Sequence, residues 1–202
     1  EFSQVLLNGK PVPFKNNNKQ FILYQGYQIG ENTLQLHFEA FPTQTMYFVN
    51  WDFSPTVQTP EQVQGQIWTQ GQGKYTSHWL PSFDDPNEKV IFSTTVRFHK
   101  SFTVVSNGEL IQQKAIGDDI EWQYQMTQPM SSYLVALAIG HYQKRTLLSK
   151  NGVPLEQYYE AEDAARLAVG HGLLDAQHVA VHVAHVVEVR EEERARLVEA
   201  AG

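Results

Sequence analysis

Short alternating runs of apolar and polar residues fill positions 4–159, and this pattern restricts the chain mainly to β structure. Clear examples are residues 33–38 (TLQLHF) and residues 91–98 (IFSTTVRF). Successive side chains of a strand point to opposite faces, so alternation predicts strands with one buried face. We therefore expect a mainly β fold, an antiparallel β-sandwich whose short strands are separated by tight turns.

Turn residues punctuate these runs. Asn8-Gly9, Asn107-Gly108 and Asn151-Gly152 each lie between two runs, and both residue types tolerate positive φ in tight turns. Residues 131–139 are nearly continuously apolar after Ser132 and end at Gly140. Such a run predicts a strand buried on both faces, with a short buried helix as the alternative.

The composition changes abruptly at about residue 160. From Ala161 onward the chain has no Lys, Asn, Ser, Thr, Pro, Ile, Met or aromatic residue. Residues 162–169 and 188–200 have helix-forming composition, and we assign helix to 178–183 although its residues alternate like a strand. We predict a β-sandwich domain at 1–160 and a short α-helical C-terminal segment of different composition at 161–202, which could be a fusion, a frameshifted reading or a divergent start of a second domain.

Charge and cysteine content exclude several classes of function. The formal net charge is -7 and no cluster of Lys and Arg is present, so we expect no nucleic-acid partner. No apolar run approaches the roughly 18 residues of a membrane span, so we expect no membrane partner. The absence of cysteine excludes disulfides and thiolate metal sites and leaves the compartment open.

The stretch 69–89 (TQGQGKYTSHWLPSFDDPNEK) contains the polar residues of greatest interest. Asp85-Pro86-Asn87-Glu88 fits a helix start, with Asp85 as N-cap, Pro86 at the first helical position and Glu88 reaching back. The alternative is that the two aspartates form an acid/base pair. No partner group lies nearby in the sequence, so the helix start is the favoured interpretation.

Gln70 and Gln72 project from the same face of a predicted strand. A neutral amide carries both donor and acceptor, so two of them could hold a peptide backbone, whereas the alternative is a solvated sheet face.

The four tryptophans are expected to lie in the core, because large aromatic residues in an alternating pattern are usually buried. The alternative is that they form a sugar-binding platform. They are Trp51, Trp68, Trp79 and Trp122.

The sequence of residues 68–110 (WTQGQGKYTSHWLPSFDDPNEKVIFSTTVRFHKSFTVVSNGEL) resembles the N-terminal domain of M1 zinc aminopeptidases, the leukotriene A4 hydrolase and aminopeptidase N family. The matching elements are Thr69-Gln70, Leu80-Pro81, the stretch Phe83-Asp84-Asp85-Pro86, and Ser106-Asn107-Gly108. Residues 130–142 (MSSYLVALAIGHY) and 152–159 (GVPLEQYY) are similar to later strands of that domain. The resemblance covers residues 4–159 in order.

This resemblance implies a saddle-shaped β-sandwich that closes one side of the active-site cleft of a thermolysin-like zinc domain. It also implies that Gln70 and Gln72, which match the substrate-holding Gln-x-Gln pair of the leukotriene A4 hydrolase branch, bind a peptide substrate. The sequence departs from the family at Ser82, where a Cys is usual, and at Asp85, where a Glu is usual. Ser77-His78 replaces a basic residue, which leaves a local ion pair without its cation.

The zinc-binding sequence HExxH and the GAMEN-type loop of these enzymes are not present in the 202 residues. The nearest match, His178 to His182, has the right spacing but has Val179 in place of the general base. If helical, His178, His182 and His185 share a face and could bind a metal, or form a simple packing stripe. We expect zinc in the full-length family enzyme, none in this chain, and no peptidase activity from this chain alone.

The family enzymes remove N-terminal amino acids from peptides, and this chain is predicted to be the substrate-side, non-catalytic part of such an enzyme. The chain begins at Glu1 without a methionine, and its first residues resemble strands that usually follow an opening hairpin. We therefore expect a fragment that is incomplete at its N-terminus. The alternative function is a β-sandwich scaffold for protein association, with residues 161–202 as the contact helix.

Overall fold

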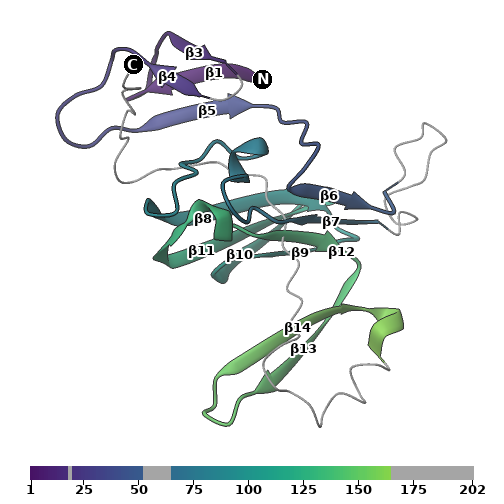
Figure 1. The fold of residues 1–202 in the computed structure, drawn as a ribbon. Helices are drawn as coiled ribbons and strands as arrows, with labels where there is room; N and C mark the ends of the chain where they lie inside the picture. The colour runs from purple at the N-terminus through teal and green to yellow at the C-terminus, as the bar shows by residue number, and fades with distance from the viewer. Residues whose placement is uncertain (18–19, 52–64, 165–202) are drawn as a thin grey trace.

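The computed structural model describes residues 1–17, 20–51 and 65–164, and its strands form three tiers (Figure 1). The first tier contains a sheet of order β2-β1-β5 and the hairpin β3-β4. These strands are β1 (Phe2–Leu7), β2 (Lys10–Pro11), β3 (Phe14–Asn16), β4 (Phe21–Leu23) and β5 (Leu34–Phe38). Val5 and Leu7 of β1 and Leu23 of β4 form a small core between these strands.

The central tier is a sandwich of two sheets. One sheet has the order β6-β7-β12-β9 and the other has the order β10-β11-β8. The first is built from β6 (Met46–Val49), β7 (Gln66–Thr69), β9 (Thr103–Ser106) and β12 (Leu137–Gly140). The second is built from β8 (Lys89–His99), β10 (Glu109–Ile116) and β11 (Asp119–Ser131). Below them in Figure 1 lies the two-stranded ribbon of β13 (Tyr142–Leu148) and β14 (Pro154–Glu160).

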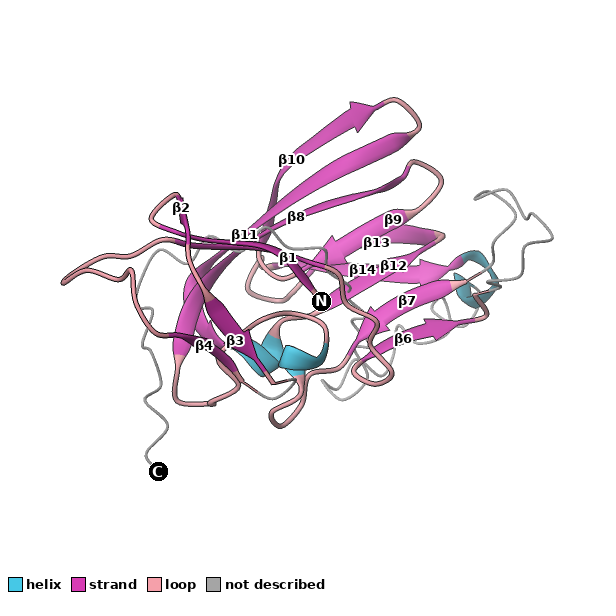
Figure 2. Cartoon of the chain, turned by 90° about the horizontal axis from the view of Figure 1, so that it is seen from above, coloured by secondary structure: helices cyan, strands magenta, loops and turns pink. Residues whose placement is uncertain are grey.

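Every strand pair in the described residues is antiparallel, which confirms the mainly β, antiparallel fold expected from the alternating sequence. Three short 3-10 helices occur within the described residues (Figure 2, cyan). They are η1 (Thr76–His78), η2 (Ser132–Leu134) and η3 (Ala161–Asp163). The described part of the chain includes no helix long and apolar enough to cross a membrane. Only residues 162–164 of the predicted C-terminal helices belong to the described part of the chain, and the three histidines at 178, 182 and 185 lie outside it.

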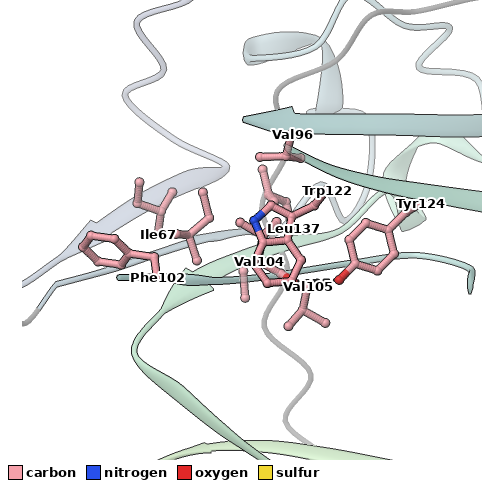
Figure 3. Packing of buried hydrophobic residues seen from close by; sticks show 10 residues of the cluster. Ile67, Val96, Phe102, Val104, Val105, Trp122, Tyr124 and Leu137 are labelled. Carbon is pink, nitrogen blue, oxygen red and sulfur yellow. Dashed lines mark hydrogen bonds between the residues drawn. The ribbon is translucent and has the colours of Figure 1, made fainter. Parts of the chain in front are cut away.

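The main core lies between the two central sheets, as Figure 3 shows. Both sheets contribute, because each alternating strand turns its apolar face inward. Tyr124 reaches across to donate its hydroxyl to the carbonyl of Val104, at 2.7 Å. Burial raises the pKa of Tyr124, because the phenolate would lose its hydration. The buried members are Ile67, Val96, Phe102, Val104, Val105, Trp122, Tyr124, Leu137, Ala138 and Ile139.

The predicted helix start at residues 85–88 is wrong. Asp85 does accept a backbone N–H, that of Asn87 at 2.9 Å, but the hydrogen bond closes a turn and no helix follows. Strand β8 begins at Lys89, which pairs with Ser131. Pairing with β11 therefore takes the backbone groups that a helix would have used, a long-range effect that local sequence does not encode.

The single strand predicted over residues 131–139 is also interrupted. Strand β11 ends at Ser131, η2 follows, and β12 begins at Leu137, with all four of its residues buried as predicted for a strand covered on both faces. The side chain of Asn107 causes part of the break. It donates to the carbonyl of Leu134 at 3.1 Å and accepts the N–H of Ala136 at 2.6 Å, so these backbone groups leave the ladder.

The Asn-Gly pairs behave in two ways. Asn8-Gly9 joins the paired strands β1 and β2, and Asn151-Gly152 lies in the turn between β13 and β14. Asn107-Gly108 instead joins β9 to β10, which belong to different sheets. A Cβ at Gly108, where φ is +84°, would lie 2.1 Å from the carbonyl oxygen of Gln125. Glycine is therefore required there by a close approach of two backbones.

Candidate functional site

The candidate site is the segment that leaves β7 and carries Gln70 and Gln72. Strand β7 ends at Thr69, before both glutamines and three residues short of Gln72. The N–H of Gln70 still donates to the carbonyl of Thr45 at 2.8 Å, and Gln72 begins a turn. Thr69 and Gly71 are buried while both glutamines are exposed. The alternation predicted from sequence is thus retained although the strand itself has ended.

Gly71 explains why both glutamines face outward. A Cβ built on Gly71 would lie 2.4 Å from Oγ1 of Thr76 and 3.1 Å from the carbonyl oxygen of Tyr133. The backbone at this residue therefore packs directly on two other segments, and a larger residue would displace it. With Gly71 fixed against the body of the domain, the side chains on either side of it point to solvent.

A buried hydrogen bond attaches this segment to the rest of the domain. Thr76 is fully buried, and its hydroxyl donates to the carbonyl of Ser132 at 3.0 Å. The carbonyl of Thr76 also accepts the N–H of Leu80 at 3.0 Å. In addition, the hydroxyl of Thr69 accepts the N–H of Leu137 at 3.0 Å, which joins the end of β7 to the start of β12. These bonds fix the glutamine-bearing segment to the sandwich.

The carboxylate of Asp84 accepts hydrogen bonds from three serines around this segment. It accepts the N–H of Ser77 at 3.2 Å, the hydroxyl of Ser82 at 3.2 Å and the hydroxyl of Ser132 at 3.4 Å. Serine at 82, where the family usually has cysteine, thus acts as a donor. These three contacts come from neutral donors, around the point where the family's basic residue is replaced by Ser77-His78.

Asp85 serves the neighbouring turn. The backbone N–H of Asn87, which donates to its carboxylate, holds the pKa of Asp85 below its ordinary range, with a smaller contribution from the nearby charge of Lys74. A carboxylate stabilised in its charged form is a poor proton donor at neutral pH. The contacts of both aspartates therefore favour a role in holding turns over an acid/base pair.

Beside the glutamines lies a group that the sequence did not predict. An N–H of the Gln44 side-chain amide donates to Nδ1 of His78 at 3.0 Å. The His78 ring in turn contacts the ring of Tyr75 edge to face, with centroids 5.6 Å apart. Gln44 is 34 residues before His78 and belongs to the loop before β6. No local signal predicts this contact, because only the pairing of β6 with β7 brings the two segments together.

The four tryptophans do not form one sugar-binding platform. Trp79 and Trp122 are buried in two different clusters. Trp68 stacks on Tyr47 with centroids 4.4 Å apart. Trp51 packs against the rings of Phe98 and Phe102. The core interpretation is therefore supported for Trp79, Trp122 and the partly buried Trp51, whereas Trp68 contacts an aromatic neighbour on the adjacent strand.

The exposed groups of this surface are the amides of Gln70 and Gln72, the rings of Tyr75 and His78, and the ammonium of Lys74. Within residues 1–17, 20–51 and 65–164, no group of three His, Cys, Asp or Glu side chains is placed to hold a metal ion. In Figure 1 the segment between β7 and β8 lies above the central sheets, on the side of the first tier. Such a surface can bind a polar chain by hydrogen bonds and contact a side chain through Tyr75.

Solved structures with the same fold include an M1 zinc metallopeptidase and a leukotriene A4 hydrolase. The M1 zinc metallopeptidase of Deinococcus radiodurans has a TM-score of 0.64 at 19% identity, over 80% of this chain and 38% of that chain. Yeast leukotriene A4 hydrolase in complex with bestatin has a TM-score of 0.64 at 16% identity, over 82% of this chain and 25% of that chain. At these identities the likeness shows the fold.

Sequence relatives point to the same family. Probable aminopeptidase 1 of Sulfurisphaera tokodaii is 27% identical over 144 residues, which are 71% of this chain and 17% of that protein. Aminopeptidase B of Rattus norvegicus is 35% identical over 85 residues, 40% of this chain and 13% of that protein. The chain thus spans less than a fifth of the length of these relatives. The family model described as the Peptidase M1 N-terminal domain matches residues 3–134, and the chain belongs to this family.

Proposed function

We propose that this chain is the substrate-side domain of an M1 zinc aminopeptidase that removes N-terminal amino acids from peptides, and that Gln70 and Gln72 contact the peptide. The observation that carries the proposal is the exposed pair of amides on either side of the buried Gly71. An amide offers both a donor and an acceptor, which suits the N–H and C=O groups of a peptide backbone.

The support beneath the pair strengthens the proposal. A binding surface gains affinity when its groups are already held in place, because less freedom is lost on binding. The hydrogen bonds from Thr76 to Ser132 and from Ser77 to Asp84 hold the backbone of this segment. One of the solved relatives is an M1 zinc metallopeptidase mutant bound to a Tyr-Ser-Ala substrate, with a TM-score of 0.62 over 78% of this chain.

Zinc belongs to the family enzymes, but the described residues present no ligand set for it. The proposal therefore assigns the hydrolytic chemistry to a catalytic domain and only substrate binding to this chain. It also keeps residues 1–160 as the β domain and 161–202 as a separate segment, on the basis of the change in composition at residue 160.

The test is a chimera in which this chain replaces the matching part of the Deinococcus radiodurans enzyme, with kcat and KM measured on Tyr-Ser-Ala. Gln70→Ala and Gln72→Ala should each raise KM about 2-fold to 10-fold, since each removes a neutral hydrogen bond. Gln113→Ala is the matched control, because Gln113 is also an exposed glutamine but lies on β10. Unchanged kinetics in both test variants would overturn the glutamine assignment and favour a scaffold.

A second measurement tests the same proposal without the chimera, and therefore still applies if the chimera is inactive. The side-chain amide signals of Gln70 and Gln72 can be followed by nuclear magnetic resonance while the 202-residue chain is titrated with Tyr-Ser-Ala. Shifts at these two amides, and none at Gln113, would support the proposal. Signals that stay fixed up to millimolar peptide would count against it.

A further inference from the structure

Tyr75 presents a large ring to solvent three residues after Gln72. Its exposed fraction is 51%. Single exposed aromatics are common on protein surfaces, so exposure alone does not indicate a binding role. What distinguishes Tyr75 is how its ring is held and what lies next to it.

The ring is held from two sides. A Cβ built on Gly73 would lie 3.5 Å from Cε2 and 3.6 Å from Cδ2 of Tyr75, so the ring packs over this glycine. On its other side it meets the His78 ring edge to face, at an interplanar angle of 73°. His78 is itself held by two hydrogen bonds. Its ring Nδ1 accepts an N–H of the Gln44 side-chain amide at 3.0 Å, and its backbone N–H donates to the carbonyl of Tyr75 at 3.1 Å.

A ring held in this way loses little freedom when a ligand packs against it, and tyrosine gives a large apolar contact with only two side-chain torsions. Peptide sites commonly combine a few polar groups that bind the backbone with an apolar wall that selects a side chain. Gln70 and Gln72 supply the first component. Tyr75, which packs over the glycine that directly follows Gln72, is placed to supply the second.

We propose that Tyr75 is a specificity-determining contact for an apolar side chain of the peptide, and that His78 and Gln44 position its ring. The proposal rests on the proposed function above, because it names the kind of side chain that the same surface selects. Tyr24 is a useful contrast. It is exposed to 62%, but it follows β4 in the first tier and is not part of this cluster.

The test uses the chimera and tripeptides in which each position in turn is Ala, Leu, Phe or Asp. The unmodified chimera should prefer Leu or Phe over Asp at one position. Tyr75→Ala should reduce that preference, measured as a ratio of kcat/KM, by about threefold to tenfold. Tyr75→Phe should retain it, because the ring remains, and Tyr24→Ala should leave it unchanged.

The positioning role has its own readout. His78→Ala and Gln44→Ala should each weaken the preference by about 2-fold to 5-fold, in the range of an edge-to-face ring contact or a neutral hydrogen bond. In the Tyr75→Ala background, His78→Ala should add nothing, because the ring that it positions is gone. Full additivity of the two substitutions would overturn the positioning role.

The outcomes separate this inference from the proposed function. If Gln72→Ala raises KM while Tyr75→Ala leaves every substrate ratio unchanged, the inference about Tyr75 fails and the proposed function stands. If neither substitution has an effect, the proposed function fails. Equilibrium binding of the same tripeptides to a chimera whose catalytic glutamate is replaced gives these ratios independently of turnover, so an inactive chimera still decides the question.

Discussion

Strand β12 and the ribbon β13-β14 use the same antiparallel pairing but are stabilised differently. All four residues of β12 are buried, and the strand lies between β7 and β9 in its sheet. The ribbon pairs along its whole length, yet half of its residues are exposed, the other half are only partly buried and none is fully buried. It has polar cross-strand contacts, such as Lys144 to Glu156 at 2.6 Å and Arg145 to Gln157 at 2.8 Å.

The difference shows where a binding surface can be built. Burial of apolar side chains contributes kilocalories per residue, whereas an exposed polar pair contributes about 1 kcal/mol or less. The glutamine-bearing segment leaves β7, next to β12, and is bonded to Ser132 and Leu137. The glutamine-bearing segment is therefore attached to the part of the domain whose apolar side chains are buried.

The largest effect should follow from a cavity beside β12. Leu137 is 1% exposed, so Leu137→Ala should lower the free energy of unfolding by about 2 to 5 kcal/mol. Leu155→Ala in the ribbon, where the side chain is 43% exposed, should change it by less than about 1 kcal/mol. Urea unfolding of the chain measures both. Equal losses for the two leucines would abolish the distinction between β12 and the ribbon.

The second prediction concerns Gly71. Gly71→Ala places a methyl group 2.4 Å from Oγ1 of Thr76, so the segment must shift, with a loss of stability of about 1 to 3 kcal/mol. The KM of the chimera for Tyr-Ser-Ala should rise as well, because the shift moves both glutamines. Gly117→Ala is a control with nothing within 4 Å of the added Cβ, although its φ of +64° also disfavours alanine. An unchanged KM in Gly71→Ala would show that the glutamines do not depend on this close approach.

A smaller loss is expected from Thr76→Val, which keeps the shape of the side chain and removes its hydroxyl. The carbonyl of Ser132 then loses one donor but still accepts the N–H of Val135 at 2.9 Å, so the cost should be about 0.5 to 1.5 kcal/mol. Amide hydrogen exchange should show faster opening of residues 70–80, while the ribbon should be unaffected. Protection that stays the same at 70–80 would mean that this bond does not support the segment.

The smallest effect should be the pH dependence of the ribbon. The Lys144 ammonium, which binds the carboxylate, holds the pKa of Glu156 below its ordinary value of 4.5. A carboxyl whose pKa is lowered on folding stabilises the fold above that ordinary value, and this stabilisation is lost as the pH falls through the folded-state pKa. Both side chains are nearly half exposed, so the effect should stay below about 1 kcal/mol.

Hydrogen exchange of the ribbon between pH 6 and pH 3, corrected for the intrinsic rate, measures this loss. In Lys144→Ala the pH dependence should largely disappear. Lys114→Ala, on the exposed strand β10, is the control and should keep it. A ribbon whose protection does not change in unmodified protein over this range would contradict the prediction.

Sequence alone predicted the strands because alternation is a local property of the chain. It predicted the exposure of Gln70 and Gln72 for the same reason. It did not predict the turn at Asp85, because the competing partner of that segment, Ser131, is distant in sequence. Gln44 was missed in the same way, since its contact with His78 depends on the pairing of β6 with β7.

The resemblance to M1 enzymes supplied what local pattern could not. Pattern alone favoured a solvated sheet face for the two glutamines, whereas the family relationship favours a substrate role. The substrate role of Gln70 and Gln72 and the role of residues 161–202 stay predictions.

The long-range bonds beneath the candidate site also bear on how the chain folds. The bond from Thr76 to Ser132 closes a loop of 56 residues, and that from Thr69 to Leu137 closes one of 68. Contacts between segments so far apart form slowly, because loop closure precedes any gain in packing. Residues 70–78 can therefore reach their final arrangement only after η2 and β12 have been synthesised and have docked. A ribosome-bound chain that ends before residue 132 would lack the proposed peptide-binding surface, so binding through Gln70 and Gln72 would require a complete central sandwich.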